Sequence, residues 1–330
     1  MMIIYDPIIK ALQSYGGITV YYNTLINGCI KNNVPFIINK RRQRKIFRYS
    51  AVPIEKHNNT STNIFHSSYY RLPNEKSLAV VTTVHDFIYE KYISGAARVI
   101  HSCQKKKAIT NSDIVICISQ NTANDLMNFC SIPKNKIRVV YNGVSDGFYT
   151  LQESVPITNK ILFIGSRASY KNFELAIKAV SLHPDLELNI VGGGDLNTHE
   201  TNLLKSFIPD RYHFKGSVSE ADLNILYNES FCLLYPSSYE GFGIPILEAM
   251  RAGCPVIAVN SSSIPEVAGD AALLSNSLDV DEISVLIGKL YDQNIRKKII
   301  ELGLKQSLNF SWDKCFNETK AIYDELSKKN

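Results

Sequence analysis

Short apolar runs alternate with longer amphipathic stretches along the whole chain of 330 residues. The apolar runs are rich in Ile, Val and Leu, as in AVVTTV at 79–84, and predict buried strands. The stretches between them repeat apolar residues every three or four positions and predict helices. Regular alternation of strand and helix is typical of βαβ units, so the pattern predicts an α/β protein with parallel sheets.

The same pattern divides the chain into two comparable halves. In the first half, strands are predicted at 2–5, 36–38, 64–66, 79–84, 114–118 and 138–140, and helices at 18–30, 95–108 and 122–129. In the second half, strands are predicted at 160–164, 187–191, 212–214, 232–235, 255–259 and 272–274, and helices at 173–183, 197–207, 220–230, 245–252, 280–291 and 296–308, with a final helix from 311. The polar stretch 146–159 interrupts the pattern and predicts a domain boundary, with domains at 1–150 and 151–310.

Charge is unevenly distributed between the halves. Residues 1–150 hold 19 Lys and Arg against 8 Asp and Glu, whereas residues 151–330 hold 17 against 23. A basic half favours an anionic partner, either nucleic acid, anionic lipid headgroups or a phosphorylated substrate, although a merely solvated basic face fits equally well. The basic cluster at 40–48 (KRRQRKIFR) is expected in an exposed loop or helix end. Because no aromatic-rich basic motif accompanies it and the second half is acidic, a nucleic-acid partner is disfavoured.

Cysteine usage and hydropathy indicate the cellular compartment of the protein. The seven cysteines are scattered without a C-x-x-C pair, which favours a reducing compartment and argues against a disulfide framework or a zinc site. The apolar start is too short for a signal peptide, and no apolar run approaches the length of a membrane span. We therefore expect the protein in the cytoplasm, with peripheral association at the inner face of the membrane as a further expectation.

The most informative segment is 239–267 (YEGFGIPILEAMRAGCPVIAVNSSSIPEV). Two glycines precede a helix that Pro245 is suited to begin and Gly253 to end. Glycines there allow the backbone to approach a ligand, and the N–H groups at the helix start favour a phosphate. Glu240 lies before the helix and Glu248 in its first turns, so both carboxylates can accept hydrogen bonds from sugar and ribose hydroxyls at the two ends of a nucleotide sugar.

This segment resembles the E-x7-E signature of the retaining glycosyltransferases called group 1 or family 4, which include bacterial mannosyltransferases and sucrose synthases. The resemblance implies a GT-B fold, in which two Rossmann-like domains with parallel sheets face a central cleft. It further implies that 1–150 binds the acceptor, that 151–310 binds the nucleotide sugar, and that the last helix (311–330) packs back on the first domain. In that reading Glu240 contacts the donor sugar and Glu248 the ribose, within a donor site formed with Gly241, Phe242, Gly243, Ile244 and Leu247.

A second segment, 161–173 (ILFIGSRASYKNF), places two cations in a loop between strand and helix. Arg167 and Lys171 can neutralise a diphosphate there, although two solvated loop cations would give the same sequence. The family carries such a pair after a glycine turn, here Gly165, where it stabilises the leaving nucleoside diphosphate; Tyr170 stands where many members have a second Arg. By the same resemblance the backbone near Val218 lines the base pocket.

The first half offers further candidates at strand ends. Gly16 and Gly17 precede a helix, in a turn that the resemblance places opposite the donor phosphates. His85-Asp86 closes the strand 79–84, at the sheet edge where α/β proteins bind ligands. The family uses a histidine at the position of His85 near the donor sugar. His66, Tyr69 and Asp86 are candidates for the acceptor site, with structural packing as the alternative.

The resemblance also bears on mechanism and partners. It implies transfer with retention, with the leaving phosphate accepting the proton from the acceptor hydroxyl. No cofactor or metal ion is expected, because no Asp-x-Asp triplet lies in the segments that carry the resemblance and the nucleotide sugar is itself a substrate. The favoured donor is GDP-mannose and the favoured acceptor a glycan or lipid-linked oligosaccharide of polysaccharide synthesis, as in lipopolysaccharide O-antigen. A UDP-sugar donor, or a nucleotide-sugar epimerase of the same fold, is the alternative; a dehydrogenase is disfavoured because IVGGGDL at 190–196 is not G-x-G-x-x-G.

Overall fold

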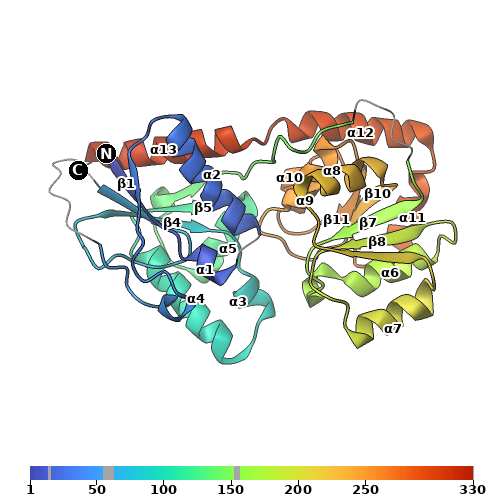
Figure 1. The fold of residues 1–330 in the computed structure, drawn as a ribbon, viewed down its shortest axis with the longest axis horizontal. Helices are drawn as coiled ribbons and strands as arrows, with labels where there is room; N and C mark the ends of the chain where they lie inside the picture. The colour runs from blue at the N-terminus through green and yellow to red at the C-terminus, as the bar shows by residue number, and fades with distance from the viewer. Residues whose placement is uncertain (14–15, 55–62, 152–156, 330) are drawn as a thin grey trace. The chain divides into compact units, whose positions relative to one another are not determined.

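The computed structural model describes residues 1–13, 16–54, 63–151 and 157–329. The chain forms two compact units, shown in Figure 1. Unit 1 comprises Met1–Gly143 with Trp312–Asn330, and unit 2 comprises Val144–Ser311. Part of the expected linker, 152–156, lies outside the described residues.

Unit 1 contains a six-stranded parallel sheet of order β2-β1-β3-β4-β5-β6. Its strands are β1 (Met2–Asp6), β2 (Phe36–Ile38), β3 (Asn63–Ser67), β4 (Ala79–Val84), β5 (Ile114–Cys117) and β6 (Ile137–Val139). Its helices are α1 (Ile9–Leu12), α2 (Gly17–Lys31), α3 (Ile88–Tyr92), α4 (Gly95–Thr110), α5 (Gln120–Phe129) and α13 (Trp312–Lys329). Chain order reverses between β1 and β3, so the crevice beyond their carboxyl ends is where this topology binds ligands.

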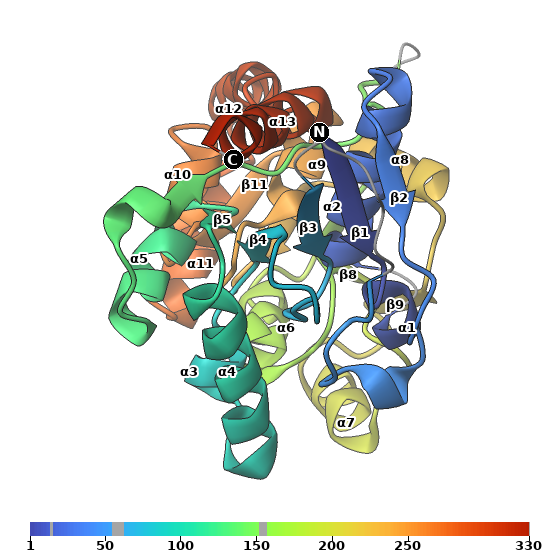
Figure 2. The ribbon, with the colours of Figure 1, turned by 90° about the vertical axis from the view of Figure 1, so that its left-hand side faces the viewer.

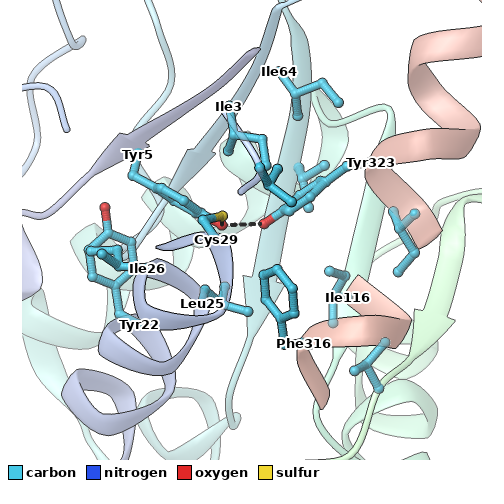
Figure 3. Close-up of a cluster of buried hydrophobic side chains, with 14 of the residues drawn as sticks. Ile3, Tyr5, Tyr22, Leu25, Ile26, Cys29, Ile64, Ile116, Phe316 and Tyr323 are labelled. Carbon is cyan, nitrogen blue, oxygen red and sulfur yellow. Dashed lines mark hydrogen bonds between the residues drawn. The ribbon is translucent and has the colours of Figure 1, made fainter. Parts of the chain in front are cut away.

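The last helix of the chain, α13, completes the core of unit 1. Figure 3 shows Phe316 and Tyr323 of α13 among apolar side chains of α2, β1 and β3. At Gly28 of α2, an added Cβ would lie 2.2 Å from the Phe316 ring, so only glycine permits this close helix contact. The Tyr323 hydroxyl is 3.2 Å from that of Tyr5, which joins the two ends of the chain in one buried hydrogen bond.

A buried ion pair anchors the basic segment 40–48. Asp6, at the end of β1, and Arg71 are fully buried, and Arg71 Nη2 lies 2.5 Å from Asp6 Oδ1. Arg71 Nη1 also donates to the carbonyl oxygens of Arg42 and Phe47. The segment forms a loop with a short 3-10 turn, Lys45–Phe47, so the expectation of an exposed loop there is confirmed.

Unit 2 contains a second parallel sheet, of order β12-β11-β10-β7-β8-β9. Its strands are β7 (Lys160–Ile164), β8 (Glu187–Val191), β9 (Tyr212–Gly216), β10 (Cys232–Tyr235), β11 (Val256–Val259) and β12 (Leu273–Ser275). Its helices are α6 (Phe173–Ser181), α7 (Thr198–Phe207), α8 (Glu220–Glu229), α9 (Ile244–Arg251), α10 (Ile264–Ala268), α11 (Val280–Lys289) and α12 (Gln293–Ser307). Chain order reverses between β7 and β10, which makes their carboxyl ends the expected ligand site.

Every predicted strand and every predicted helix is confirmed, with ends displaced by at most three residues. Three short helices, α1, α3 and α10, were not predicted, because each spans only four or five residues, too few to show a helical period. Among the described helices, none combines the length and the apolar composition that crossing a bilayer requires.

Candidate active site

The candidate site of unit 2 lies where β7 and β10 end. Gly165 follows β7 with φ of +113°, and Gly243 precedes α9 with φ of +100°, so both positions favour glycine. Pro245 lies in the first turn of α9 and Gly253 follows its end with φ of +73°, as the sequence predicted. The two loops are joined by Asn172, whose side-chain amide donates to the Pro236 carbonyl oxygen at 2.8 Å.

Lys171 and Glu240 form a largely buried ion pair in these loops. Lys171 Nζ lies 2.5 Å from Glu240 Oε1, and the two side chains are only 12% and 11% exposed. The Tyr235 hydroxyl, at the end of β10, lies 3.1 Å from the same Nζ. Ser262, in the loop after β11, accepts a hydrogen bond from the backbone N–H of Glu240 through its Oγ and so fixes the position of the glutamate. A cation and a carboxylate are thus held side by side at the carboxyl ends of β7 and β10.

Tyr235 was missed by sequence reasoning. It closes the apolar strand predicted at 232–235, a pattern that indicates burial, and it is indeed 2% exposed. Its hydroxyl nevertheless reaches the edge of the sheet, and burial, with the nearby Glu240 carboxylate, raises the pKa of this hydroxyl well above its ordinary value. The hydroxyl therefore stays protonated and available for hydrogen bonding. The sequence did contain a signal for this role, because Tyr235 is the last residue of a strand that ends at the expected ligand site.

Arg167 and Lys171 have different partners in the structure. Arg167 donates to the carbonyl oxygens of the loop after β8, at 2.8 Å to Gly192, 3.2 Å to Gly193, 2.8 Å to Gly194 and 2.8 Å to Asp195. Its Nε lies 3.0 Å from Glu200 Oε2 without hydrogen-bond alignment, and the side chain is 3% exposed. The glycine run at 192–194, which does not match the dinucleotide-binding motif, therefore binds the Arg167 guanidinium through its carbonyl oxygens.

Replacing Arg167 with alanine is expected to destabilise unit 2 by about 3 kcal/mol, because four carbonyl oxygens and the Glu200 carboxylate lose their cation. Thermal melting measures the effect. Lys205→Ala, an exposed change on α7, is the control and is expected to shift stability by no more than about 0.5 kcal/mol. An unchanged melting temperature for Arg167→Ala would contradict a scaffolding role.

Glu248 lies in the second turn of α9 and points to α8. Its Oε2 accepts a hydrogen bond of 2.9 Å from the Tyr227 hydroxyl. Burial raises the pKa of the Glu248 carboxyl to about 7; the Tyr227 hydrogen bond opposes the rise and the Glu220 carboxylate adds to it. Near neutral pH this group therefore exchanges between a charged acceptor and a neutral carboxylic acid.

The other predicted donor-site residues are mostly buried. Gly241, Gly243 and the side chains of Phe242 and Leu247 are covered, and Phe242 packs edge-to-face on Phe310 with ring centres 5.7 Å apart. Ile244 is half-buried at the first position of α9. The segment can therefore offer a ligand its backbone N–H groups, while its apolar side chains hold the loop on the core. Val218, between β9 and α8, is half-buried.

In unit 1 the glycine turn lies between α1 and α2, and His85 follows β4. Gly16, with φ of +137°, and Gly17 are exposed at the start of α2. The His85 ring is 8% exposed and packs edge-to-face on Tyr21, with ring centres 5.1 Å apart. Burial, with Lys105 nearby, lowers the pKa of His85 to about 3. At neutral pH its imidazole is uncharged and can act by hydrogen bonding but not as a cation.

His66 is buried in the core of unit 1. It is 1% exposed, and its ring nitrogens are 2.6 Å from the Tyr323 hydroxyl and 2.9 Å from Thr83 Oγ1. These contacts are those of structural packing, and a role for His66 at the acceptor stays a prediction. His66 lies in β3, one residue before the strand ends at Ser67, and Tyr323 of α13 and Thr83 of β4 occupy its two ring nitrogens.

Tyr69 and Asp86 line a common pocket of about 270 Å³ in unit 1. Its wall is rich in aromatic and polar groups, with Tyr89 stacked on His101 at a ring-centre distance of 3.8 Å. Arg48, the end of the basic segment, also lines it and donates a hydrogen bond to the Tyr69 hydroxyl. Tyrosine faces, a carboxylate and a guanidinium are groups suited to binding a sugar ring and its hydroxyls.

Comparison with known proteins agrees with these features. Residues 152–306 match the model of "Glycosyl transferases group 1", and residues 11–148 match that of "Glycosyltransferase Family 4". The O-antigen chain mannosyltransferase B of Escherichia coli is 28% identical over 80% of this chain and 74% of its own length. The sucrose-phosphate synthase of Thermosynechococcus elongatus superposes with a TM-score of 0.80 at 16% identity, over 100% of both chains. Anabaena HepE, solved with UDP-glucose, gives 0.73 at 14% identity over 98% of this chain and 100% of its own.

Both halves of the chain therefore carry glycosyltransferase domains, each on the parallel α/β sheet that its sequence predicts. The chain belongs to the group 1 and family 4 glycosyltransferases and has the GT-B fold.

Proposed function

We propose that the protein transfers mannose from GDP-mannose to a glycan or lipid-linked oligosaccharide, with retention at the anomeric carbon and without a metal ion. The observation that carries this proposal is the Lys171–Glu240 pair at the point where chain order reverses in the unit 2 sheet. The mannosyltransferase relative supports the choice of sugar. We place the reaction in the cytoplasm, on a precursor of a cell-surface polysaccharide.

Each side chain of the unit 2 site has a distinct task in this proposal. Lys171 and the N–H groups that open α9 stabilise the negative charge that grows on the departing diphosphate. Glu240 accepts hydrogen bonds from hydroxyls of the donor sugar while it holds Lys171 in place. Glu248 accepts hydrogen bonds from the ribose. Arg167 supports the site through the loop after β8.

Unit 1 supplies the second set of groups. The N–H groups of Gly16 and Gly17 take part in binding the diphosphate, and neutral His85 forms a hydrogen bond with a hydroxyl of the transferred sugar. The acceptor binds in the pocket of Tyr69 and Asp86. As the bond from the anomeric carbon to the phosphate oxygen breaks, the acceptor oxygen bonds to that carbon. Its proton passes to the departing phosphate, so no general base from the protein is required.

A UDP-sugar is the second candidate for the donor, because the similar structure of Anabaena HepE was solved with UDP-glucose. Thermal melting with GDP, UDP, ADP and dTDP, with and without EDTA, separates the two. We expect GDP alone to stabilise the protein, by about 2.7 kcal/mol at a hundred times its dissociation constant, and EDTA to have no effect. Stabilisation by UDP instead would change the donor, and no response to any nucleotide would contradict the proposed function.

Retention needs its own measurement. The anomeric configuration of the newly formed linkage, read from the one-bond carbon–proton coupling of the product, should match that of the donor. An inverted linkage would contradict the proposal that the leaving phosphate accepts the proton on the face from which it departs.

A further inference from the structure

The strongest surface feature outside the site is the corner formed by α3 and α4 of unit 1. Residues 91–100 are exposed without a break, across the end of α3 and the first turns of α4. This run carries four large apolar side chains, namely Tyr92, Ile93, Val99 and Ile100, which are 38%, 39%, 60% and 50% exposed. Figures 1 and 2 show α3 and α4 on the opposite side of the unit from α13. A cluster of exposed apolar side chains of this kind marks a surface that binds something.

The charges of this corner have one sign. Helices α3, α4 and α5 contain two carboxylates, Glu90 and Asp125, and both are buried in ion pairs, with Lys105 at 2.7 Å and with Lys91 at 2.7 Å. Among the exposed residues of these helices, the charged ones are all cations: Arg98, Lys106 and Lys107 on α4, and Lys91 at the end of α3, which is paired with Asp125. The outward face of the corner therefore combines apolar and basic side chains without an exposed carboxylate.

The corner is held firmly in this arrangement. Lys105 and Glu90 have side chains only 1% and 6% exposed, and Lys105 Nζ also donates to the Asp86 carbonyl oxygen at 2.9 Å. Ser102 Oγ adds a hydrogen bond of 2.8 Å to Glu90. Because breaking such a pair leaves an uncompensated buried charge, α3 is fixed on α4. The exposed apolar side chains are thus presented on a rigid support.

An apolar recess opens on the same corner. It has a volume of about 490 Å³ and is lined by Phe87, Val99, Cys103 and Phe129, together with Arg98, Lys106 and the Lys105–Glu90 ion pair. Phe129 of α5 is itself 39% exposed, so the apolar surface continues from α4 to α5. This continuity gives the corner both protruding apolar side chains and a hollow that can receive an acyl chain or another apolar group.

We propose that the α3–α4 corner docks unit 1 on an anionic lipid bilayer. Tyr92, Ile93, Val99 and Ile100 enter the layer between headgroups and acyl chains, and the exposed cations contact lipid phosphates. Apolar side chains beside cations, with no exposed carboxylate, are the chemistry that binds such a surface. The docking itself does not depend on the proposed function. Only its purpose does, which is to bring the enzyme to a lipid-linked acceptor.

Vesicle flotation with the full chain tests the apolar part of the proposal. Wild type should float with vesicles of phosphatidylcholine and phosphatidylglycerol, and much less with phosphatidylcholine alone. Val99→Ser with Ile100→Ser should lower the fraction bound at least tenfold. The matched control, Leu278→Ser with Leu308→Ser, removes two apolar side chains of unit 2 that are 50% and 72% exposed, and should bind as wild type does.

A second pair of variants tests the charge. Arg98→Gln with Lys106→Gln and Lys107→Gln should weaken binding by about two orders of magnitude, from the usual attraction of a cation near an anionic surface. Lys297→Gln with Lys298→Gln and Lys305→Gln changes the net charge equally on exposed positions of α12 and should bind nearly as wild type does. Equal loss in both triple variants would overturn the proposal, because net charge rather than the corner would then account for binding.

Insertion itself has a direct readout. Ile100→Trp should show a blue shift of its fluorescence and quenching by brominated acyl chains when anionic vesicles are added, whereas Leu308→Trp should show neither. Absence of wild-type flotation, or no quenching of Ile100→Trp, would overturn the docking proposal. Stabilisation of these variants by nucleotide, measured in the same preparations, keeps that failure distinct from a failure of the proposed function.

Discussion

Substitution of Lys171 with glutamine is expected to lower kcat by about a hundredfold to a thousandfold, with a much smaller change in KM. The proposed task of its ammonium group is to stabilise charge that exists only as the diphosphate departs, and removal of one preorganised donor of this kind costs about 3–4 kcal/mol of transition-state stabilisation. Glutamine can still donate a hydrogen bond to Glu240, so the loop is not left with an unpaired buried carboxylate. Initial rates with GDP-mannose and a glycan acceptor measure the effect.

Lys178→Ala is the matched control for this prediction. Lys178 also pairs with a glutamate in unit 2, at 2.7 Å from Glu174, but their side chains are 38% and 50% exposed. An exposed pair four residues apart on a helix contributes little, so kcat and stability should stay close to wild type. A kcat for Lys171→Gln within a few-fold of wild type, at an unchanged melting temperature, would contradict the proposed role of Lys171.

Substitution of Glu248 with glutamine is expected to stabilise the free protein at pH 8 while weakening nucleotide binding. The folded-state pKa of this carboxyl is raised to about 7, above its ordinary value of 4.5, so the folded state binds the proton more tightly than the unfolded state does. Wild type therefore loses stability as the pH rises from about 4.5 to 7 and carries the full cost above pH 7. Glutamine cannot ionise, so its advantage should grow from near zero at pH 4.5 to about 2–3 kcal/mol at pH 8, with allowance for partial exposure.

Nucleotide binding should respond in the opposite sense. Hydrogen bonds from the ribose hydroxyls to a charged carboxylate are stronger than those to an amide, so Glu248→Gln should raise the dissociation constant for GDP by about tenfold to a hundredfold. Thermal melts from pH 4.5 to 8, with and without GDP, measure both effects. Equal stability of the two proteins at pH 8 would contradict the raised pKa, and unchanged GDP affinity would contradict the ribose role.

Local sequence was sufficient for the elements that form the site. Strands and helices were predictable because parallel strands buried on both faces leave unbroken apolar runs, and because Gly243, Pro245 and Gly253 mark the ends of one helix. Glu240 and Glu248 could be placed relative to each other because one precedes the start of α9 and the other follows it. Contacts between distant segments were not predictable in this way, since nothing near Arg167 in the sequence indicates that its partners are carbonyl oxygens at 192–195.

The sequence by itself determined the α/β class, the strands and helices, the glycine turns and the resemblance to group 1 glycosyltransferases, because each depends on residues close together in the chain. Only the tertiary structure decided which polar groups meet. It brought Tyr235 to Lys171 and committed Arg167 to the glycine loop. It also covered His66 with α13, whose Tyr323 is 257 residues away. The physical reason is that burial and hydrogen bonding between distant segments depend on packing, and packing sets whether a side chain with the right chemistry is available to a ligand.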